Sequence, residues 1–342
     1  MSIMSDKERF EAALRMEGVD RISLACPLQT GTVALMDASG ACWPEAHRDP
    51  ETMAKLALAA HEIAGLESVR VPYHNDYEAE AMGCVIGEWT RDMQPLKVHF
   101  AVNTFEDIDY LRVPDPKNDA EMPFVLKAVS ILSQKVGRRL PVIAAICAPF
   151  ELAVRLRSLQ ATLNDLMEYP NQLRKLLKKC VETEIEYGRA LTEAGASAIT
   201  LADGISSCLV DPEFGTKYYM EFSQPYEQEV IAKLNTLTIL HICSDATSIL
   251  NEMGETGASG LSIDSPVDVL KAKKVLGKRA AIVGNVNSLR TLGTSTVEKV
   301  KKEAKEALTM GVDVLSPGCG FSPRTPLVNM KALKETVIEF YR

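Results

Sequence analysis

The chain contains 342 residues, of which 46% are hydrophobic and 25% are charged, and its mean hydropathy is −0.02. This composition excludes collagen-like, disordered and low-complexity chains, and the length suffices for one large α/β domain with its own core. The formal net charge of −8 argues against nucleic-acid binding, which requires a basic surface.

The sequence shows neither a membrane segment nor an export signal. No stretch approaches the ~20 apolar residues needed to span a bilayer, and residues 1–9 are polar where a signal peptide would turn apolar. The eight cysteines are irregularly spaced, unlike those of a disulfide framework. We therefore expect a cytoplasmic protein with reduced cysteines that binds neither membranes nor nucleic acid.

Short apolar runs alternate with helical patterns along the chain. The runs lack polar alternation, which is typical of parallel strands covered on both faces. They are Arg21–Pro27, Ser68–Tyr73, Pro141–Cys147, Ala198–Asp203, Leu237–Cys243, Gly260–Asp264, Ala280–Asn285 and Val312–Pro317. The helical patterns are Pro50–Ala64, Ala120–Val136, Asn171–Glu193, Pro225–Leu234, Ser265–Val275 and Ser295–Met310. Strand followed by helix, repeated about eight times, predicts a (β/α)₈ TIM barrel.

The predicted barrel forms a single domain over residues 1–342. The stretch from Tyr73 to Asp119 is too long for a simple barrel connection, so residues 74–119 are expected to form an insertion or cap. An open doubly wound sheet is the alternative fold. It is disfavoured because neither G-x-G-x-x-G after the first strand nor G-x-x-x-x-G-K-[ST] occurs in the sequence.

Three metal-binding side chains are expected at the carboxyl ends of the strands, where barrel enzymes carry their chemistry. His241 and Cys243 are two residues apart, so their side chains point to the same face of a strand. Cys319 follows the last strand between Gly318 and Gly320, which allow close backbone approach. Each residue alone could be core packing, but together they indicate a Cys₂His zinc site with an open fourth position.

Asp264 follows the neighbouring strand and could complete the zinc coordination when substrate is absent. Its alternative role is that of a helix N-cap or of a hydrogen-bonding residue within the barrel. The charge of the site indicates its chemistry. Two thiolates neutralise Zn²⁺, so a thiol that enters as thiolate makes the complex negative and keeps its sulfur electron-rich. Such a site favours attack by a thiolate on an alkyl group over hydrolysis.

Further polar residues at the strand ends are candidates for contacts with a substrate or a cofactor. Asp203 and Asn285 are expected to orient ligands or substrate, and Gln29 and Tyr73 follow the first two strands as substrate contacts. Cys147 ends the third strand, where substrate would lie.

The motifs His241-Ile242-Cys243 and Gly318-Cys319-Gly320 resemble the zinc motif of the methylcobamide:coenzyme M methyltransferases, which belong to the uroporphyrinogen decarboxylase superfamily. The resemblance covers essentially the whole chain. It includes Gln29-Thr30-Gly31, Trp43-Pro44-Glu45-Ala46-His47, Met82-Gly83-Cys84, Gly284-Asn285, Pro317 and Pro326-Leu327. It implies a TIM barrel with a short N-terminal extension over residues 1–20. The implied zinc ligands are His241, Cys243 and Cys319, with Asp264 able to complete the coordination.

The resemblance also implies a corrinoid protein as partner, since the chain lacks the Asp-x-His-x-x-Gly motif that holds a protein-bound corrinoid. The enzyme would move a methyl group between the partner's cobalt and a small molecule, best a thiol such as coenzyme M. A homodimer is compatible with this interpretation. Ser244, where coenzyme M enzymes usually have Gly, and Cys147 depart from the family pattern. They keep an alternative open, in which methyl passes from a methoxylated aromatic compound to cob(I)alamin.

Three other functions are weaker alternatives. A uroporphyrinogen decarboxylase-like lyase would need arginines near the first strand to pair with substrate carboxylates, and Cys26–Gly31 contains none. A cobalamin-independent methionine synthase would be a much longer chain with two barrels. A protein merely stabilised by zinc would have four closed ligands.

Overall fold

The computed structural model describes residues 3–93, 97–210, 213 and 215–342. The barrel strands are β1 (Ser23–Leu24), β2 (Val69–Val71), β5 (Val142–Cys147), β6 (Ala198–Asp203), β7 (Leu237–Ile242), β8 (Gly260–Ile263), β9 (Ala281–Val286) and β10 (Val314–Pro317). The helices before β7 are α1 (Asp6–Leu14), α2 (Val33–Ser39), α3 (Pro50–Glu62), α4 (Tyr77–Ala81), α5 (Phe105–Tyr110), α6 (Met122–Val136), α7 (Pro149–Arg157), α8 (Leu159–Glu168), α9 (Pro170–Glu193), α10 (Lys217–Phe222) and α11 (Gln224–Lys233). Those after it are α12 (Leu250–Glu255), α13 (Val269–Leu276), α14 (Thr291–Thr294), α15 (Val297–Met310) and α16 (Leu327–Phe340).

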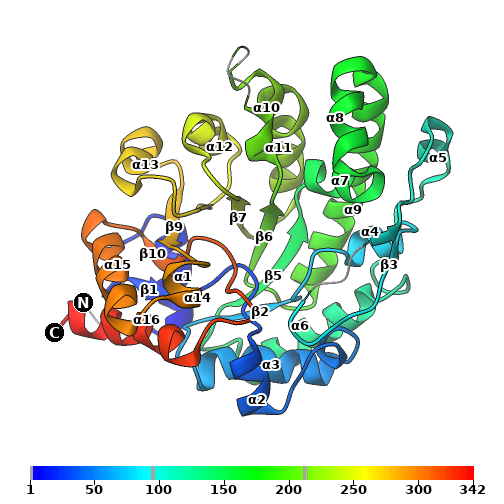
Figure 1. Ribbon diagram of the computed structural model, residues 1–342. Coiled ribbons are helices and arrows are strands. Elements are labelled where there is room, and N and C mark those ends of the chain that lie inside the picture. Colours follow the sequence, from blue (N-terminus) through cyan, green and yellow to red (C-terminus); the bar gives the residue numbers. More distant parts are fainter. Residues whose placement is uncertain (1–2, 94–96, 211–212, 214) are drawn as a thin grey trace.

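The strands form one parallel sheet in the order β1-β10-β9-β8-β7-β6-β5-β2, and helices surround it (Figure 1). The two outer strands approach each other, because the backbone N–H of Glu67 donates to the carbonyl of Leu24 at 2.7 Å. The N–H of Cys26 donates to the hydroxyl of Ser68 at 3.3 Å. These contacts close the sheet into the barrel that the strand–helix alternation predicts.

The N-terminal helix α1 packs against the interior of the barrel. Ser5 caps it in a capping box with Glu8, and its apolar side chains Phe10 and Leu14 join one buried cluster. The strands contribute to that cluster Ala25, Ile143, Ala198, Ile239, Ala281, Val283 and Val314. Gly260 leaves space for Leu14, since a Cβ at this position would lie 2.7 Å from the Leu14 Cδ2 atom. The predicted N-terminal extension is thus a helix that packs into the barrel.

Most strands are shorter than predicted, and the largest differences, at β1 and β2, have a reason in backbone hydrogen bonding. Pro27 and Pro72 have no N–H to donate to a neighbouring strand, and they lie just beyond β1 and β2. Three helices also begin later than predicted, α6 and α15 by two residues each and α13 by four. The helix expected from Ser265 begins at Val269, because the Asp268 side chain caps it by accepting the N–H of Lys271 at 2.7 Å.

The chain between β2 and α6 contains α4, a two-stranded antiparallel ribbon of β3 (Val85–Ile86) and β4 (Lys97–His99), and α5. Residues 94–96 of this predicted insertion lie outside the described residues. Asp76 ties the segment to the barrel, because its carboxylate accepts from Lys97 at 2.9 Å and from Arg155 of α7 at 2.7 Å. The insertion is therefore anchored beside the carboxyl end of β5.

Among the described residues, none of the helices combines the length and the apolar character needed to cross a bilayer.

Because α1 closes one end of the barrel with its apolar side chains, as a plug, its removal from the core is expected to lower stability. Phe10 is fully buried in the cluster, so Phe10→Ala is expected to lower the free energy of unfolding by about 3–5 kcal/mol. Urea denaturation followed by circular dichroism measures this change. Arg15→Ala, an exposed change at the end of the same helix, serves as control and should leave stability within about 0.5 kcal/mol. Equal stabilities for the two variants would contradict the role of α1 as a plug.

Candidate metal and substrate site

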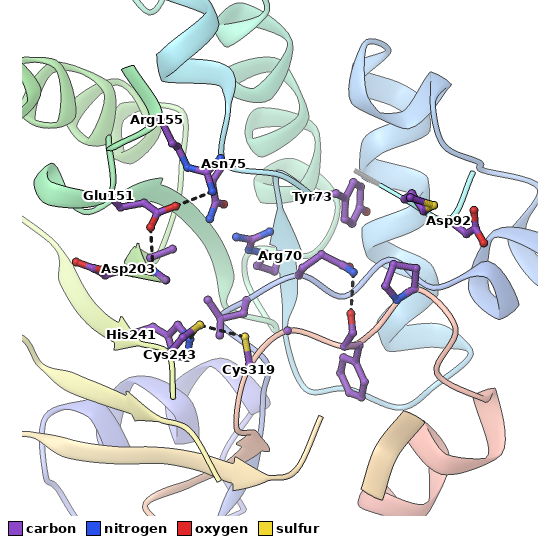
Figure 2. Close-up of a pocket in the computed structure, with 18 residues that line it drawn as sticks. Arg70, Tyr73, Asn75, Asp92, Glu151, Arg155, Asp203, His241, Cys243 and Cys319 are labelled. Atoms are coloured by element: carbon purple, nitrogen blue, oxygen red, sulfur yellow. Dashed lines mark hydrogen bonds and ion pairs between the residues drawn. The ribbon is translucent and has the colours of Figure 1, made fainter. Parts of the chain in front are cut away.

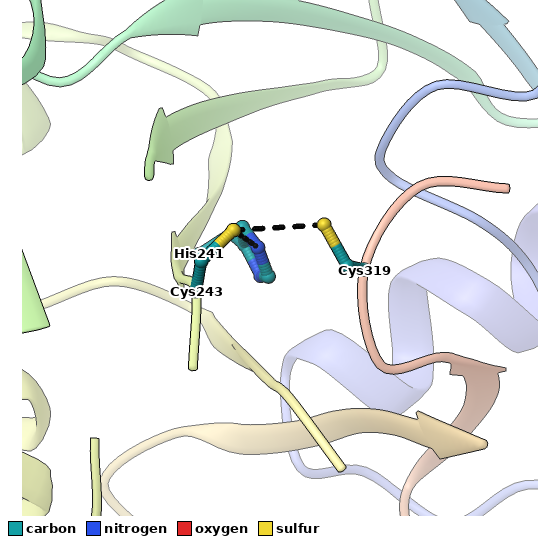
Figure 3. Close-up of side chains that lie close together, drawn as sticks. All are labelled: His241, Cys243 and Cys319. Atoms are coloured by element: carbon teal, nitrogen blue, oxygen red, sulfur yellow. Dashed lines mark hydrogen bonds between the residues drawn. The ribbon is translucent and has the colours of Figure 1, made fainter. Parts of the chain in front are cut away.

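His241, Cys243 and Cys319 converge at the carboxyl end of the barrel (Figure 3). His241 lies in β7, Cys243 follows that strand, and Cys319 follows β10. The Nε2 atom of His241 lies 3.0 Å from the sulfur of Cys243, which lies 3.5 Å from the sulfur of Cys319. All three potential ligand atoms lie within 4.8 Å of one another, which is close enough for one tetrahedral ion with bonds of about 2.0–2.3 Å.

The neighbouring strand orients the imidazole. The Nδ1 atom of His241 lies 3.0 Å from the carbonyl oxygen of Ser262 and 3.1 Å from its hydroxyl. A carbonyl can only accept, so Nδ1 carries a proton and Nε2 is the atom presented to the cysteines. This is the arrangement that fixes a metal-binding histidine from behind.

The two thiols share their protons unequally. The S–H of Cys243 donates to Cys319, which, together with His241, holds the pKa of Cys319 below that of an ordinary thiol despite burial. The pKa of Cys243 is raised by the same contact and by burial. Burial lowers the pKa of His241, but the negative charge on Cys319 outweighs it and raises the pKa overall. Of the two sulfurs, Cys319 is thus the one whose environment favours the thiolate.

Asp264 lies beside this group but outside the set of ligand atoms within 4.8 Å. Its carboxylate accepts the backbone N–H groups of Ser244 at 2.9 Å and Ser265 at 2.6 Å. Ser244 has a φ of +67°, a left-handed conformation that favours glycine, and the bond to Asp264 supports it there. Asp264 is also not a helix N-cap, since Asp268 caps α13.

A cavity of about 510 Å³ opens over the three residues (Figure 2). It is lined by Leu28, Gln29, Arg70, Tyr73, Asn75, Asp92, Met93, Glu151, Arg155, Ala202, Asp203, Gly204, His241, Cys243, Cys319, Gly320, Phe321 and Pro323. A metal held by these three residues would therefore have its remaining position toward a space large enough for a small substrate.

Three of the five predicted contact residues line the cavity, namely Gln29, Tyr73 and Asp203. The Gln29 side chain donates to the carbonyl of Phe321 at 2.8 Å, and its own oxygen is buried without a partner. The hydroxyl of Tyr73 donates to the carbonyl of Met53 at 2.9 Å. Burial raises the pKa of Asp203 to about 6, and the charge of Glu151 adds to this effect.

Cys147 and Asn285, the other two, lie outside the lining of the cavity. Cys147 is fully buried, and its S–H donates to the carbonyl of Asn75 at 3.1 Å. The side-chain amide of Asn285 donates to the carbonyl of Val267 at 2.8 Å and so supports the loop after β8. Cys147 therefore contacts Asn75, which does line the cavity, whereas Asn285 contacts the loop that carries Asp264.

Sequence reasoning missed two arginines that line the cavity. Arg70 lies in β2, and Arg155 lies in α7, a helix that was not predicted because it begins directly after β5. Arg70 could have been noticed as a charged residue within an apolar strand. Arg155 could have been noticed because it forms a pair with Glu151 at i,i+4 spacing, which indicates a helix. The lack of arginine near the first strand therefore does not mean that the cavity lacks arginine, since Arg70 and Arg155 reach it from β2 and α7.

Only one of these arginines is neutralised by carboxylates. Arg155 lies 2.6 Å from Glu151 and 2.7 Å from Asp76. Arg70 is 1% exposed and donates to the carbonyl of Pro72, but its Nε–H has no partner. Among the described residues, no carboxylate lies within ion-pair distance of Arg70. Burial lowers its pKa to about 10, so it stays charged at neutral pH.

The lowered pKa of Cys319 predicts that its thiol reacts with alkylating agents at lower pH than an ordinary cysteine. In chelator-treated protein at pH 6, iodoacetamide is expected to modify Cys319 well before the exposed Cys208, whose pKa is raised by partial burial. Modification of Cys319 should vary little as pH rises from 6 to 8, whereas that of Cys208 should increase. Mass spectrometry of peptides measures both. Cys243→Ala removes the S–H donor and should shift the reactivity of Cys319 to higher pH; an unchanged profile would contradict the assignment.

Comparison with known proteins agrees with this geometry. Residues 5–340 match the model of the family "Uroporphyrinogen decarboxylase (URO-D)". The chain is 40% identical over the full length of both proteins to the methylcobamide:CoM methyltransferase MtaA of Methanosarcina barkeri. It is 36% identical to the methylcobamide:CoM methyltransferase MtbA of Methanosarcina acetivorans, over 98% of each chain.

A solved structure shows the same fold. A methyltransferase from Methanosarcina mazei superimposes with a TM-score of 0.94 at 40% identity, over 99% of this chain and 100% of that one. These comparisons confirm the resemblance predicted from the zinc motif. The chain is a methyltransferase that belongs to the URO-D family and, within it, to the methylcobamide:coenzyme M methyltransferases.

Proposed function

We propose that this enzyme transfers a methyl group from the cobalt of a corrinoid protein to the thiol of coenzyme M, with zinc bound by His241, Cys243 and Cys319. One observation carries the proposal: a histidine nitrogen and two cysteine sulfurs lie together at the floor of a cavity of about 510 Å³. The names of the relatives support coenzyme M as acceptor and a methylcobamide as donor.

The residues fit a zinc ion by their chemistry. Two sulfurs and one imidazole nitrogen are ligands that zinc prefers, and Ser262 holds the imidazole from behind. Zinc bound there would lower the pKa of a thiol in its open position and hold it as a nucleophilic thiolate. We leave Asp264 out of the ligand set, since both of its oxygens already accept backbone N–H groups.

The cavity also contains a charge complementary to coenzyme M, which is 2-mercaptoethanesulfonate. A buried guanidinium without a carboxylate partner is energetically costly unless an anion joins it. Arg70 is such a group, and its planar donors suit a sulfonate. We assign Arg70 to the sulfonate, so that the substrate lies with its anionic end at β2 and its sulfur toward Cys243 and Cys319.

The corrinoid must come with a partner, since the chain has no Asp-x-His-x-x-Gly motif for holding one. The partner would present its methylated cobalt at the opening of the cavity, at the carboxyl end of the strands. Apolar side chains at the cavity, Leu28, Phe321 and Pro323, exclude water from the reacting sulfur once the opening is covered. We place this reaction in the cytoplasm, where the free cysteines stay reduced.

Methyl transfer with free methylcobalamin tests the function. Zinc-loaded wild type is expected to pass methyl to coenzyme M. Cys319→Ala should lose most of its zinc and at least about 100-fold of its activity, because removing a metal ligand costs more activity than removing a residue that only supports a ligand. Cys208→Ala, an exposed cysteine outside the cavity, is the matched control. Absorbance of methylcobalamin measures transfer, and elemental analysis measures zinc.

Two results would count against the proposal. Stoichiometric zinc in Cys319→Ala at the wild-type level would remove Cys319 from the ligands. Absence of transfer to coenzyme M, together with transfer from a methoxylated aromatic compound to cob(I)alamin, would reverse the direction of the reaction.

The role of Arg70 is tested by comparing two thiols of equal length. Arg70→Met is expected to reduce kcat/KM for coenzyme M by roughly 10- to 150-fold, since a hydrogen bond to a charged group contributes about 1.5–3 kcal/mol. Transfer to 2-mercaptoethanol, which lacks the sulfonate, should be unchanged, and Arg70→Lys should recover part of the loss. An equal loss with both thiols would mean that Arg70 supports only the fold.

A further inference from the structure

A second group of potential metal ligands lies behind the wall of the cavity. It consists of Glu78 on α4, Cys147 at the end of β5 and Glu184 in the middle of α9. One ligand atom from each lies within 4.8 Å of the other two, and all three side chains are buried, with exposures of 2%, 0% and 0%. None of the three lines the cavity, so this group is separate from His241, Cys243 and Cys319.

The polar atoms of this group are incompletely satisfied by protein. One oxygen of Glu78 accepts the backbone N–H of Cys147 at 2.9 Å. Both oxygens of Glu184 are buried without a hydrogen-bond partner. The hydroxyl of Tyr187, one turn along α9 and fully buried, also has no partner. Buried carboxylates that lack donors are rare and are expected to bind a proton, a water or a cation.

No basic side chain serves as that cation. Within the described parts of the chain, no lysine, arginine or histidine forms an ion pair with Glu78 or Glu184. Arg155 is near enough to influence Glu78 and Cys147 electrostatically, but its guanidinium is paired with Asp76 and Glu151. Neither carboxyl group is therefore ion-paired with a basic side chain among the described residues.

We propose that Glu78, Cys147 and Glu184 form a second, structural site for a divalent ion of the zinc class. A thiolate sulfur with two carboxylate oxygens suits a borderline ion such as Zn²⁺, whereas Mg²⁺ and Ca²⁺ prefer oxygen alone. On binding, the Cys147 thiol and any protonated carboxyl release their protons to solvent. The S–H bond from Cys147 to the Asn75 carbonyl is then lost.

The position of the site indicates its role. It joins the insertion, through α4, to β5 and α9 of the barrel. Asn75 and the first turn of α7, which begins two residues after Cys147, form part of the wall of the catalytic cavity. An ion there would hold this wall in position without contacting the substrate, so Glu78, Cys147 and Glu184 are positioning residues. This inference does not rest on the proposed methyl transfer.

Metal content of the full chain tests the site. After loading with zinc and removal of free metal, wild type is expected to contain about two ions per chain, and Glu184→Gln and Cys319→Ala about one each. Glu184→Gln with Cys319→Ala should contain none. Glu186→Gln, an exposed acid on the same helix, is the matched control and should keep the wild-type content.

Absorption spectroscopy with Co²⁺ in place of zinc provides a second test, which does not depend on Glu184→Gln folding normally. In the Cys319→Ala background, Co²⁺ bound beside Cys147 should produce a thiolate-to-cobalt absorption band, which Cys147→Ser should abolish. Two results would overturn this inference and leave the proposed function intact. The first is a single ion in wild type that Glu184→Gln retains and Cys319→Ala loses. The second is the absence of a thiolate band in the Cys319→Ala protein. One ion lost with Glu184→Gln and retained in Cys319→Ala would support it and remove the catalytic zinc instead.

Discussion

Closure of the barrel is the constraint on which the rest of the structure depends. The sulfurs of Cys243 and Cys319 lie 3.5 Å apart, although 76 residues separate them in the chain. They follow β7 and β10, and two strands, β9 and β8, lie between these in the sheet. Only the curvature of a closed sheet brings such side chains together, since in a flat sheet strands three positions apart lie about 14 Å from each other. The plug of α1 and the contacts between β1 and β2 therefore support the metal site from a distance.

The chemistry of the cavity follows from the separation of its charges. The two sulfurs lie just after β7 and β10, whereas the guanidinium of Arg70, which has no carboxylate partner among the described residues, lies in β2. The substrate proposed above, with a thiol at one end and an anion at the other, would satisfy both. Burial strengthens both interactions, because charges in a cavity screened from water attract more strongly than at a surface.

The insertion after β2 connects the cavity to the outer helices. Asp76 accepts from Arg155, which lines the cavity, and from Lys97 of the insertion. Two residues later, Glu78 reaches Cys147 and Glu184. A short segment thus contributes both to the wall of the cavity and to the second cluster. A substitution in one is therefore expected to alter the stability of the other.

The sequence by itself determined the barrel and the convergence of three residues whose side chains could hold a metal. Parallel strands have continuous apolar runs, and carboxyl ends of barrel strands meet on one face, so His241, Cys243 and Cys319 could be placed together from their positions alone. The zinc motif also identified the family. The ends of strands and helices were predicted less accurately. Pro27 and Pro72 lack the N–H that would continue β1 and β2, and the side chain of Asp268 caps α13.

Only the tertiary structure decided which other side chains face the cavity. Arg70 and Arg155 reach it from β2 and α7, whereas Cys147, at an apparently suitable strand end, points behind the wall. The direction in which a side chain points depends on the tilt of its strand and on the nearest hydrogen-bond acceptor. Neither of these can be recognised from a pattern in a single sequence. The same holds for the unpaired charge of Arg70 and for the meeting of Glu78 with Glu184, since contacts between distant segments arise only when the barrel packs.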